Sequence, residues 1–579
     1  MQINNAYSSS YNKSNNNRNS TENKRQAQPS FGGAGNPLVA LANFIENNGF
    51  LGEFLTVDAF GMATPRTIQG YNRNKEELGH PNYKAGREEL GREVISGPAF
   101  FFVPAGVLAI AALLKGKSTK LTVETLDIFK GVMKNTAKDL KDLKNPKDIN
   151  EKFLENITSN AFEGFEHRKE KITEIKEIFS NVLDKKICKK DAKKAVEEAL
   201  TTLNKANGKF IDDTSKIKIG KKDLSISDLV SDIPNYLEDF TNKSQKTSES
   251  TTDFIEKFHQ KTSFVRKTTN IIAVSALSAF LVIIPKLYQT DKKFPGLDGL
   301  DTNNHKTKKH KSKEDEQKNN QSVSFSGNHS GNGGKLFNWA AERCSLGNKG
   351  DLTRNMFLAI SSIFMVGSRF KDSRGNDERR EVLTRDIPGV LLSCYGAPIL
   401  NSAMAYMITK KTGIPIIQFA EKQAQNIKNA KFISQKQVKD LYTKFGELKN
   451  PLITFSETVE KHGGDIKKIM NKLGLAGELK AIHGNEGATN KEIIESLKKA
   501  QSANSHEFET LERGLTKLTE DNKVFKFAQK AQAGVKIGGI LFTAAILGVI
   551  IPRLNIVNTK KKYQDKDAEH HHSPQASKT

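Results

Sequence analysis

The residues best suited to chemistry in this sequence stand in two short charged segments, each directly before a long apolar run. A Glu precedes an Arg by four residues in both segments, and on a helix such a pair contributes about 0.2–0.5 kcal/mol. We expect these pairs to stabilise a helix as it enters a membrane interface. A charged mouth or gate is the functional alternative. The candidate juxtamembrane charge pairs are formed by Arg87, Glu88, Arg92, Glu93, Arg380, Glu381, Arg385 and Asp386.

No other pattern predicts catalysis, a cofactor or a metal site. The segment 331–335 (GNGGK) resembles a phosphate-binding loop, but His329 and Leu336 stand where the motif needs Gly and Ser or Thr. The three cysteines lie far apart, and the histidine run 570–572 falls in a polar tail. The sequence therefore favours a protein that is not an enzyme.

The net charge favours anionic partners. Lys and Arg number 90 against 66 Asp and Glu, which gives a formal charge of +24. Nucleic acid and an anionic membrane face both fit this charge. With a single Trp and no interleaving of basic and aromatic residues, the chain offers no stacking platform, so nucleic acid is the less favoured partner.

Four uncharged apolar runs decide between these partners. They cover residues 94–114, 268–285, 387–409 and 537–552, near the length of about 20 residues that spans a bilayer, and Lys or Arg flanks nearly every end. A shorter stretch, 355–368, is expected to be interfacial or re-entrant. We therefore predict a multi-pass membrane protein, in a membrane that the sequence does not identify. The alternative is a soluble helical protein with these runs in its core.

The chain also repeats itself. Four landmarks recur in the same order with offsets of roughly 270–305 residues. They are the motif at 30–33 and 324–327, the charged segments, Leu-Lys-Asn-Pro at 143–146 and 448–451, and Ile-Ile-Pro at 283–285 and 550–552. Two spans in each half would give both halves the same membrane orientation. This topology places Cys188 and Cys344 on opposite sides of the bilayer.

The predicted fold class is all-α, a tandem duplication in which each half has two transmembrane helices and a Lys-rich helical inter-span region. The N-terminus, the central linker and the C-terminal tail are expected to be disordered. The predicted segments are a tail 1–35, repeat unit 1 at 36–289 with inter-span region 118–267, a flexible basic linker 290–323, repeat unit 2 at 324–558 with inter-span region 412–536, and a polar tail 559–579.

Several local features refine this prediction. Ser434 with Gln437 and Thr489 with Glu492 have the spacing of reciprocal helix caps. The segments 254–267 and 508–530 are expected to continue without a break into the second span of their half. Pro104 and Pro398 are candidate helix breaks within the first spans. The candidate anionic-lipid contacts, which follow the second spans, are Lys286, Lys292, Lys293, Arg553, Lys560, Lys561 and Lys562.

Three functions are compatible with these observations. The leading hypothesis is a membrane scaffold or membrane-organising protein that binds anionic lipids and assembles with a protein partner, or with itself, through its Lys-rich helices. A transporter or pore built from two parallel repeats is the second, although no apolar run contains a charged residue. The third is a protein exported without a signal peptide that inserts into another membrane.

Overall fold

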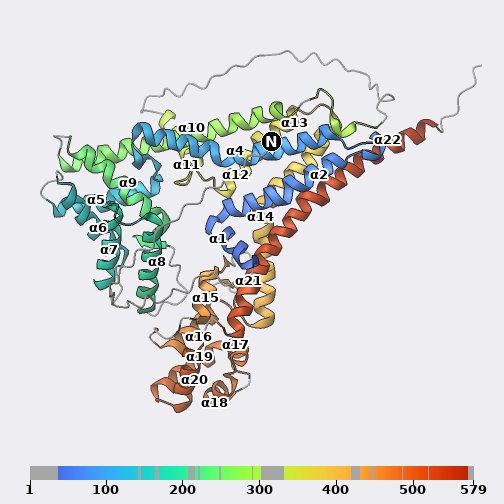
Figure 1. Cartoon of the computed structure of the whole chain (residues 1–579). Helices are drawn as coiled ribbons and strands as arrows, with labels where there is room; N and C mark the ends of the chain where they lie inside the picture. The colour runs from blue at the N-terminus through green and yellow to red at the C-terminus, as the bar shows by residue number, and fades with distance from the viewer. Residues whose placement is uncertain are drawn as a thin grey trace, which may run out of the picture.

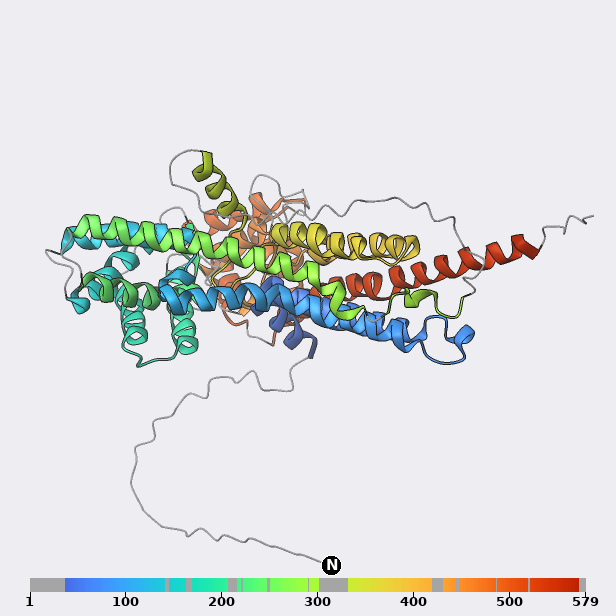
Figure 2. The same ribbon diagram turned by 90° about the horizontal axis from the view of Figure 1, so that it is seen from above.

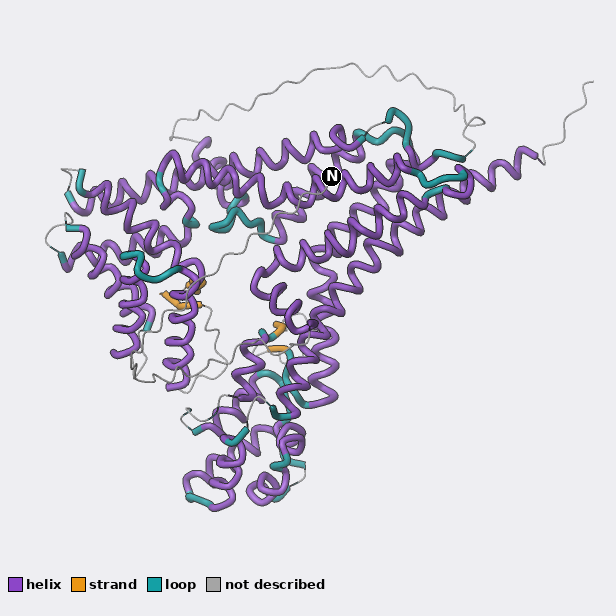
Figure 3. Tube along the Cα trace, viewed as in Figure 1, coloured by secondary structure: helices purple, strands orange, loops and turns teal. Residues whose placement is uncertain are grey.

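The computed structural model describes residues 37–571 of the chain, except for several internal segments. These are 141–144, 163–168, 207–215, 220–221, 247–249, 290, 301–331, 419–430, 444, 446–447, 449, 486 and 519–520. The predicted N-terminal tail, most of the predicted linker and the repeated motif at 30–33 and 324–327 lie outside the described residues. The described part is almost entirely helical, which confirms the all-α prediction (Figure 3).

Two long helical hairpins form the frame of the molecule (Figure 1). The first hairpin consists of α4 (Tyr83–Lys115) and α10 (Thr251–Tyr288), which pack along one another and lie side by side when seen from above (Figure 2). The second consists of α14 (Asn376–Thr412) and the continuous helix α21 (Lys523–Ala545), η6 (Ile546–Ile550) and α22 (Ile551–His571). The hairpins meet at the N-terminal ends of α4 and α14, here called the charged end, and diverge from it (Figure 1).

The first helical domain follows α4 at the opposite end of the first hairpin. It contains η2 (Lys117–Lys120), α5 (Val123–Asp139), α6 (Pro146–Ala161), α7 (Lys169–Leu183), α8 (Lys189–Ala206), the antiparallel strands β1 (Lys216–Ile219) and β2 (Lys222–Ser225), and α9 (Ile226–Ser244). Aromatic rings fill its core, with Phe129 5.1 Å from Tyr236 and 5.6 Å from Phe153 between ring centroids.

The second helical domain occupies the corresponding place between α14 and α21. It contains β3 (Ile417–Gln418), β4 (Lys431–Phe432), α15 (Gln435–Thr443), α16 (Pro451–Lys461), α17 (Ile466–Leu473), α18 (Ala476–His483), α19 (Asn490–Ser502) and α20 (His506–Thr516). Both predicted reciprocal caps are confirmed, at Ser434 with Gln437 and at Thr489 with Glu492. The prediction of one helix over 508–530 is wrong, because α20 ends at Thr516 and α21 begins at Lys523. The same prediction for 254–267 is confirmed within α10.

A lead helix precedes each hairpin and packs on the other one. The first consists of α1 (Pro37–Thr56), η1 (Val57–Ala63) and α2 (Thr64–Asn72), with the short α3 (Lys75–Leu78) after it; α1 and η1 pack on α21. The second consists of α12 (Arg354–Ile360), η4 (Ser361–Val366) and α13 (Gly367–Lys371), and its η4 and α13 pack on α10. Both η1 and η4 are π-helical turns. The stretch 355–368 thus lies within the bundle.

Several boundaries differ from the sequence prediction. Residues 291–300, predicted as flexible linker, include η3 (Pro295–Leu297) and pack on the chain near Arg73. The tail predicted from residue 559 is helical as far as His571. Neither α4 nor α14 is broken at Pro104 or Pro398, since both helices continue through these residues. In α14 and α4 the helix simply accommodates the missing N–H group.

The segment before the second lead helix also lies elsewhere than predicted. Helix α11 (Asn332–Arg343) packs on α10, with the ring of Phe337 5.4 Å from that of Phe264. Cys344, half-buried, follows α11 directly. It therefore lies at the same end of the first hairpin as the first helical domain and Cys188, not at the opposite end.

The long helices carry large apolar side chains on their outer surfaces. Four helices are long and apolar enough to cross a membrane, and only 28–44% of the residues in their most apolar windows are buried. On α4, Leu113 is 86% exposed and Phe102 75% exposed. Soluble proteins bury such side chains because leaving them in water costs about 1.5–3 kcal/mol each. The alternative that these runs form the core of a soluble protein is therefore poorly matched by the packing.

Candidate functional site

Charged side chains from both hairpins and both lead helices converge at the charged end. We call this cluster the ion-pair network. It contains six arginines and six acidic residues, all with side chains no more than 17% exposed. Its members are Arg66, Arg73, Glu88, Glu89, Arg92, Glu93, Arg369, Arg374, Glu378, Glu381, Arg385 and Asp386.

The outer layer of the network exchanges partners between the halves of the chain. Arg73 follows α2 and donates two hydrogen bonds to Glu381 of α14, at 2.8 and 2.5 Å. Arg374 precedes α14 and donates two hydrogen bonds to Glu88 of α4, at 2.8 and 2.7 Å. Both pairs have the parallel two-bond geometry that makes Arg–carboxylate contacts specific. Each arginine therefore fastens the hairpin of the other half.

One aromatic ring lies close to both of these arginines. The guanidinium carbon of Arg73 lies 5.0 Å from the ring centroid of Phe294, and that of Arg374 lies 5.7 Å from it. Backbone carbonyls next to this ring accept further hydrogen bonds: Gly296 from Arg73 Nε at 2.8 Å, and Pro295 from Asn82 at 2.9 Å. The short segment after α10 thus closes the network from one side.

A deeper layer connects each lead helix to a first span. Arg66 of α2 donates to Glu93 of α4 at 2.7 Å, and also to the carbonyl of Leu547 in η6 at 3.1 Å. Arg369 of α13 donates to Asp386 of α14 at 3.0 Å and to Ser96 Oγ of α4 at 3.1 Å. Each of these two arginines therefore contacts elements from both halves.

The two first spans meet directly through Glu89. Its Oε1 accepts from Arg92 of the same helix at 3.1 Å and from Arg385 of α14 at 2.8 Å. Arg385 also donates to Asp386 at 2.9 Å, and Arg92 stacks on the ring of Tyr288 at 5.3 Å. The Glu–Arg pairs predicted at a spacing of four residues thus give way to contacts between helices.

Of the eight predicted charged residues, the structure brings six into the network. Arg87 and Arg380 are exposed and lie outside it. The sequence argument missed the other six members of the network: Arg66, Arg73, Glu89, Arg369, Arg374 and Glu378. One signal was available: the mainly apolar stretch 54–63 ends three residues before Arg66, and the apolar stretch 355–368 ends directly before Arg369.

Arg374, which lies outside the spans, illustrates why the buried arginines of the network stay protonated. Burial opposes its positive charge, but hydrogen bonds from its side chain to Glu88 and Glu378 outweigh that effect and raise its pKa above the usual range. Arg374 also donates to Glu378 through Nη2 at 2.8 Å and to the carbonyl of Asp291 at 3.0 Å. The guanidinium is therefore held by groups from three parts of the chain.

The network leaves little free space. A cavity of about 30 Å³ lies beside Arg73 and Glu88, and one of about 40 Å³ lies beside Asp58 and Arg66. A water molecule needs about 10–15 Å³ of such space. Each cavity therefore holds a few waters and no larger solute.

Two of the seven predicted lipid contacts are used within the protein. Lys560 forms an ion pair with Glu77, and Lys562 forms one with Asp377. Tyr563 donates to the same carboxylate of Asp377 at 2.7 Å. These contacts fasten the C-terminal helix α22 to the charged end. The remaining five side chains are exposed: Lys286, Lys292, Lys293, Arg553 and Lys561.

Within the described residues, no group of three or more His, Cys, Asp or Glu side chains is placed to hold a metal ion. The three cysteines are unpaired, and Cys394 is fully buried in α14. No protein-family model, curated protein or solved structure matches the chain.

Proposed function

We propose that the chain is a multi-pass integral membrane scaffold without catalytic activity, built from two copies of one unit that are clamped together by the ion-pair network. The apolar outer surfaces of the hairpins support lipid as their solvent. The two helical domains then stand on one side of the bilayer, where they can organise a partner protein or further copies of the chain. The surfaces of these two domains would determine which partner protein is bound.

The duplication is supported by the way that the contacts repeat. Each unit would consist of a lead helix with a π-helical turn, an arginine after it, a first span with a buried Glu, a helical domain and a second span. Arg73 and Glu88 in one unit correspond to Arg374 and Glu381 in the other. Because each arginine binds the carboxylate of the other unit, the pairs exchange as they would around a two-fold axis.

The observation that carries the scaffold proposal is this pair of exchanged two-bond contacts. Breaking a buried ion pair costs about 3–5 kcal/mol, so a network of such pairs favours one arrangement of the helices. A transporter must instead move its units past one another around a central site. Cavities that hold only a few waters favour the fixed arrangement.

A protease site placed in residues 301–331 of the full chain tests the clamp. After cleavage in detergent, we expect the two halves to elute together in size-exclusion chromatography. Replacing both Arg73 and Arg374 by Ala should separate them, whereas the matched change of the exposed Arg87 and Arg380 should not. Halves that separate without any substitution would contradict the proposal, and so would a purified protein that stays monodisperse without detergent and fails to float with liposomes.

A transporter or pore is the second candidate, and one observation favours it. Three π-helical turns, η1, η4 and η6, lie in the bundle, and such turns are frequent at functional sites. Asp58 of η1 is buried beside the larger of the two cavities. Flux through liposomes that is lost in Asp58→Asn, or in Pro104→Ala with Pro398→Ala, would support this candidate over the scaffold.

Export and insertion into another membrane is the third candidate. It depends on the Ser/Asn-rich residues 1–28, which lie outside the described residues. Secretion into culture medium that requires these residues is the measurement that would support it.

A further inference from the structure

A larger pocket lies at the opposite end of the first hairpin from the ion-pair network. It has a volume of about 550 Å³, within the range of small-molecule sites. One wall is formed by α4, through Ala105, Leu108 and Ala109. The remaining walls come from the first helical domain and from the segment that precedes the second lead helix. Both halves of the chain therefore build this pocket.

Five lysines line the polar walls and dominate the charge of the pocket. Of these five lysines, only Lys193 has an ion-pair partner within 4 Å among the described residues: Glu197, at 3.9 Å. Two acidic residues, Asp228 and Asp232, also line the pocket, which leaves a net positive charge. The five lysines are Lys120, Lys189, Lys190, Lys193 and Lys349.

Buried hydrogen bonds fix the wall that carries Lys349. Arg266, fully buried in α10, donates to the carbonyls of Leu346 at 2.7 Å and Gly347 at 2.8 Å. Asn348 donates to Asp232 at 2.6 Å and accepts from the backbone of Thr122 at 3.0 Å. This wall is therefore formed before any ligand arrives.

The backbone of the same segment lies directly on α4. Gly350 has φ +86, and a Cβ added there would come within 2.8 Å of the backbone nitrogen of Ala105. A residue with a side chain would not fit this close approach. Lys349, next to Gly350, is thereby held beside Ala105 in the apolar run 94–114.

We propose that this pocket binds a phosphate-bearing anion, and that its source is the headgroup of an anionic membrane lipid. Lysine ammonium groups supply the charge for a phosphate. Towards the charged end, the apolar wall of α4 continues into the exposed Phe102, which offers a path for an acyl chain into the bilayer. The lipid source rests on the proposed membrane embedding, whereas the phosphate site does not.

The acidic residues of the pocket weaken this charge less than their number suggests. Burial, followed by the nearby charge of Asp228, raises the pKa of Asp232 to about 7. Burial also raises the pKa of Asp228.

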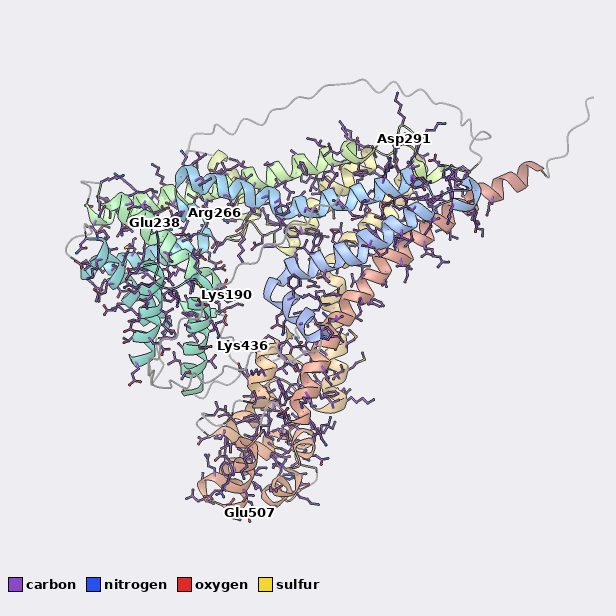
Figure 4. The ribbon with its side chains drawn as sticks, in the orientation of Figure 1. Lys190, Glu238, Arg266, Asp291, Lys436 and Glu507 are labelled. Carbon is purple, nitrogen blue, oxygen red and sulfur yellow. The ribbon has the colours of Figure 1, made fainter. Side chains whose placement is uncertain are left out.

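The side of the first helical domain that carries Lys190 faces the second helical domain (Figure 4). Lys436 of α15 lies on the facing side, 3.8 Å from Glu197 of α8.

Binding of a fluorescent short-chain phosphatidic acid to the full chain in neutral detergent tests the proposal. We expect displacement by dioctanoyl phosphatidic acid and none by dioctanoylglycerol, which lacks the phosphate. Replacing Lys189, Lys190 and Lys349 by Gln should weaken binding about fivefold per lysine at low salt, or about a hundredfold together. The matched control replaces three exposed lysines in and after the second helical domain's last helices, Lys491, Lys499 and Lys517, and should weaken binding less than about threefold.

Other results would overturn either the phosphate site or the lipid source. Equal loss in the two triple variants, or displacement by dioctanoylglycerol, overturns the phosphate site. Displacement by glycerol 3-phosphate or inorganic phosphate as strong as that by the lipid overturns the lipid source. Ala109→Trp, which fills the apolar wall, should weaken lipid binding and leave binding of glycerol 3-phosphate unchanged. Liposome flotation is scored separately, so that failure of the membrane proposal is distinguished from failure of the pocket.

Discussion

A guanidinium buried among helices remains charged only while carboxylates or carbonyl oxygens face it. At the charged end every arginine of the network has such partners, and the strongest contacts join residues far apart in the chain. Arg73 and Glu381 are 308 residues apart, and Arg374 and Glu88 are 286 residues apart. Because removing one partner leaves the other charge buried and unpaired, these contacts penalise any other docking of the two hairpins.

Single substitutions should reveal this penalty. Arg73→Ala should lower the free energy of unfolding by about 3–5 kcal/mol, because Glu381 would be left buried without its partner. Arg374→Ala should cost a similar amount through Glu88. Denaturant unfolding in detergent measures both effects. Arg87→Ala, at an exposed position, is the control and should change stability by less than about 0.5 kcal/mol; a similar loss in all three variants would contradict the network.

The pKa of Asp232 predicts a pH dependence of stability. Burial raises this pKa from 3.8 to about 7, so the folded state holds the proton more tightly than the unfolded state. Stability should therefore fall as the pH rises from about 4 to about 7. Nearby charges on Asp228, Arg266 and Lys189 act on the same group.

Asp232→Asn removes this titration. Relative to the unsubstituted protein, the variant should gain stability between pH 5 and pH 8, measured by denaturant unfolding at both values. The exposed Asp223→Asn is the matched control and should leave the pH profile unchanged. A variant that loses its relative stability on going to pH 8 would show that Asp232 is charged in the fold and stabilised by its neighbours.

At the scale of elements, the first lead helix and the second hairpin pack through their backbones. A Cβ added at Gly548 would lie 1.7 Å from the carbonyl oxygen of Gly61, and one added at Gly61 would lie 2.3 Å from Cβ of Ala544. Both glycines lie in π-helical turns, η6 and η1. The close approach of these two turns lets Arg66 reach the carbonyl of Leu547.

Gly548→Ala should therefore force the two helices apart. We expect a loss of about 1–3 kcal/mol or more, as for other overpacked sites, measured by thermal unfolding in detergent. Gly106→Ala and Gly534→Ala, where an added Cβ meets nothing within 4 Å, are the controls. On helical propensity alone the controls should be neutral or gain up to about 1 kcal/mol. A neutral Gly548→Ala would contradict the packing of η6 on η1.

Local patterns predict the elements well and their partners poorly. The uncharged runs locate the four long helices, and the cap spacings locate α15 and α19, because both signals depend on neighbours within one or two turns. The choice of Glu381 by Arg73 depends on how two hairpins dock, which no local spacing encodes. Residues 291–300 were predicted to be part of a flexible linker for the same reason. Their contacts with Arg73 and Asn82 depend on the folded chain and not on neighbouring residues.

At the scale of the whole molecule, the two ends of the bundle differ in kind. The charged end is closed by the ion-pair network, and the opposite end carries both helical domains (Figure 1). The described chain leaves the charged end after Leu300 and resumes at Asn332, in α11, which packs on α10 near Arg266. Residues 301–331 therefore connect opposite ends, and they include the basic run 305–311. This connection makes membrane topology the sharpest test of the architecture.

A bilayer across both hairpins would place Cys188 and Cys344 on one side and the exposed Lys293 on the other, and the polar residues 301–331 would then have to cross it. Each variant keeps a single cysteine, at 188, at 344 or at Lys293→Cys, with the other native cysteines replaced by Ser. In intact vesicles, an impermeant maleimide should either label positions 188 and 344 and spare position 293, or label position 293 and spare the other two. Labelling after detergent permeabilisation corrects for the half-buried position of Cys344. A polar chain is not stable in hydrocarbon, so the connection through 301–331 opposes this placement. Labelling of all three positions from the same side would mean that no bilayer separates the two ends.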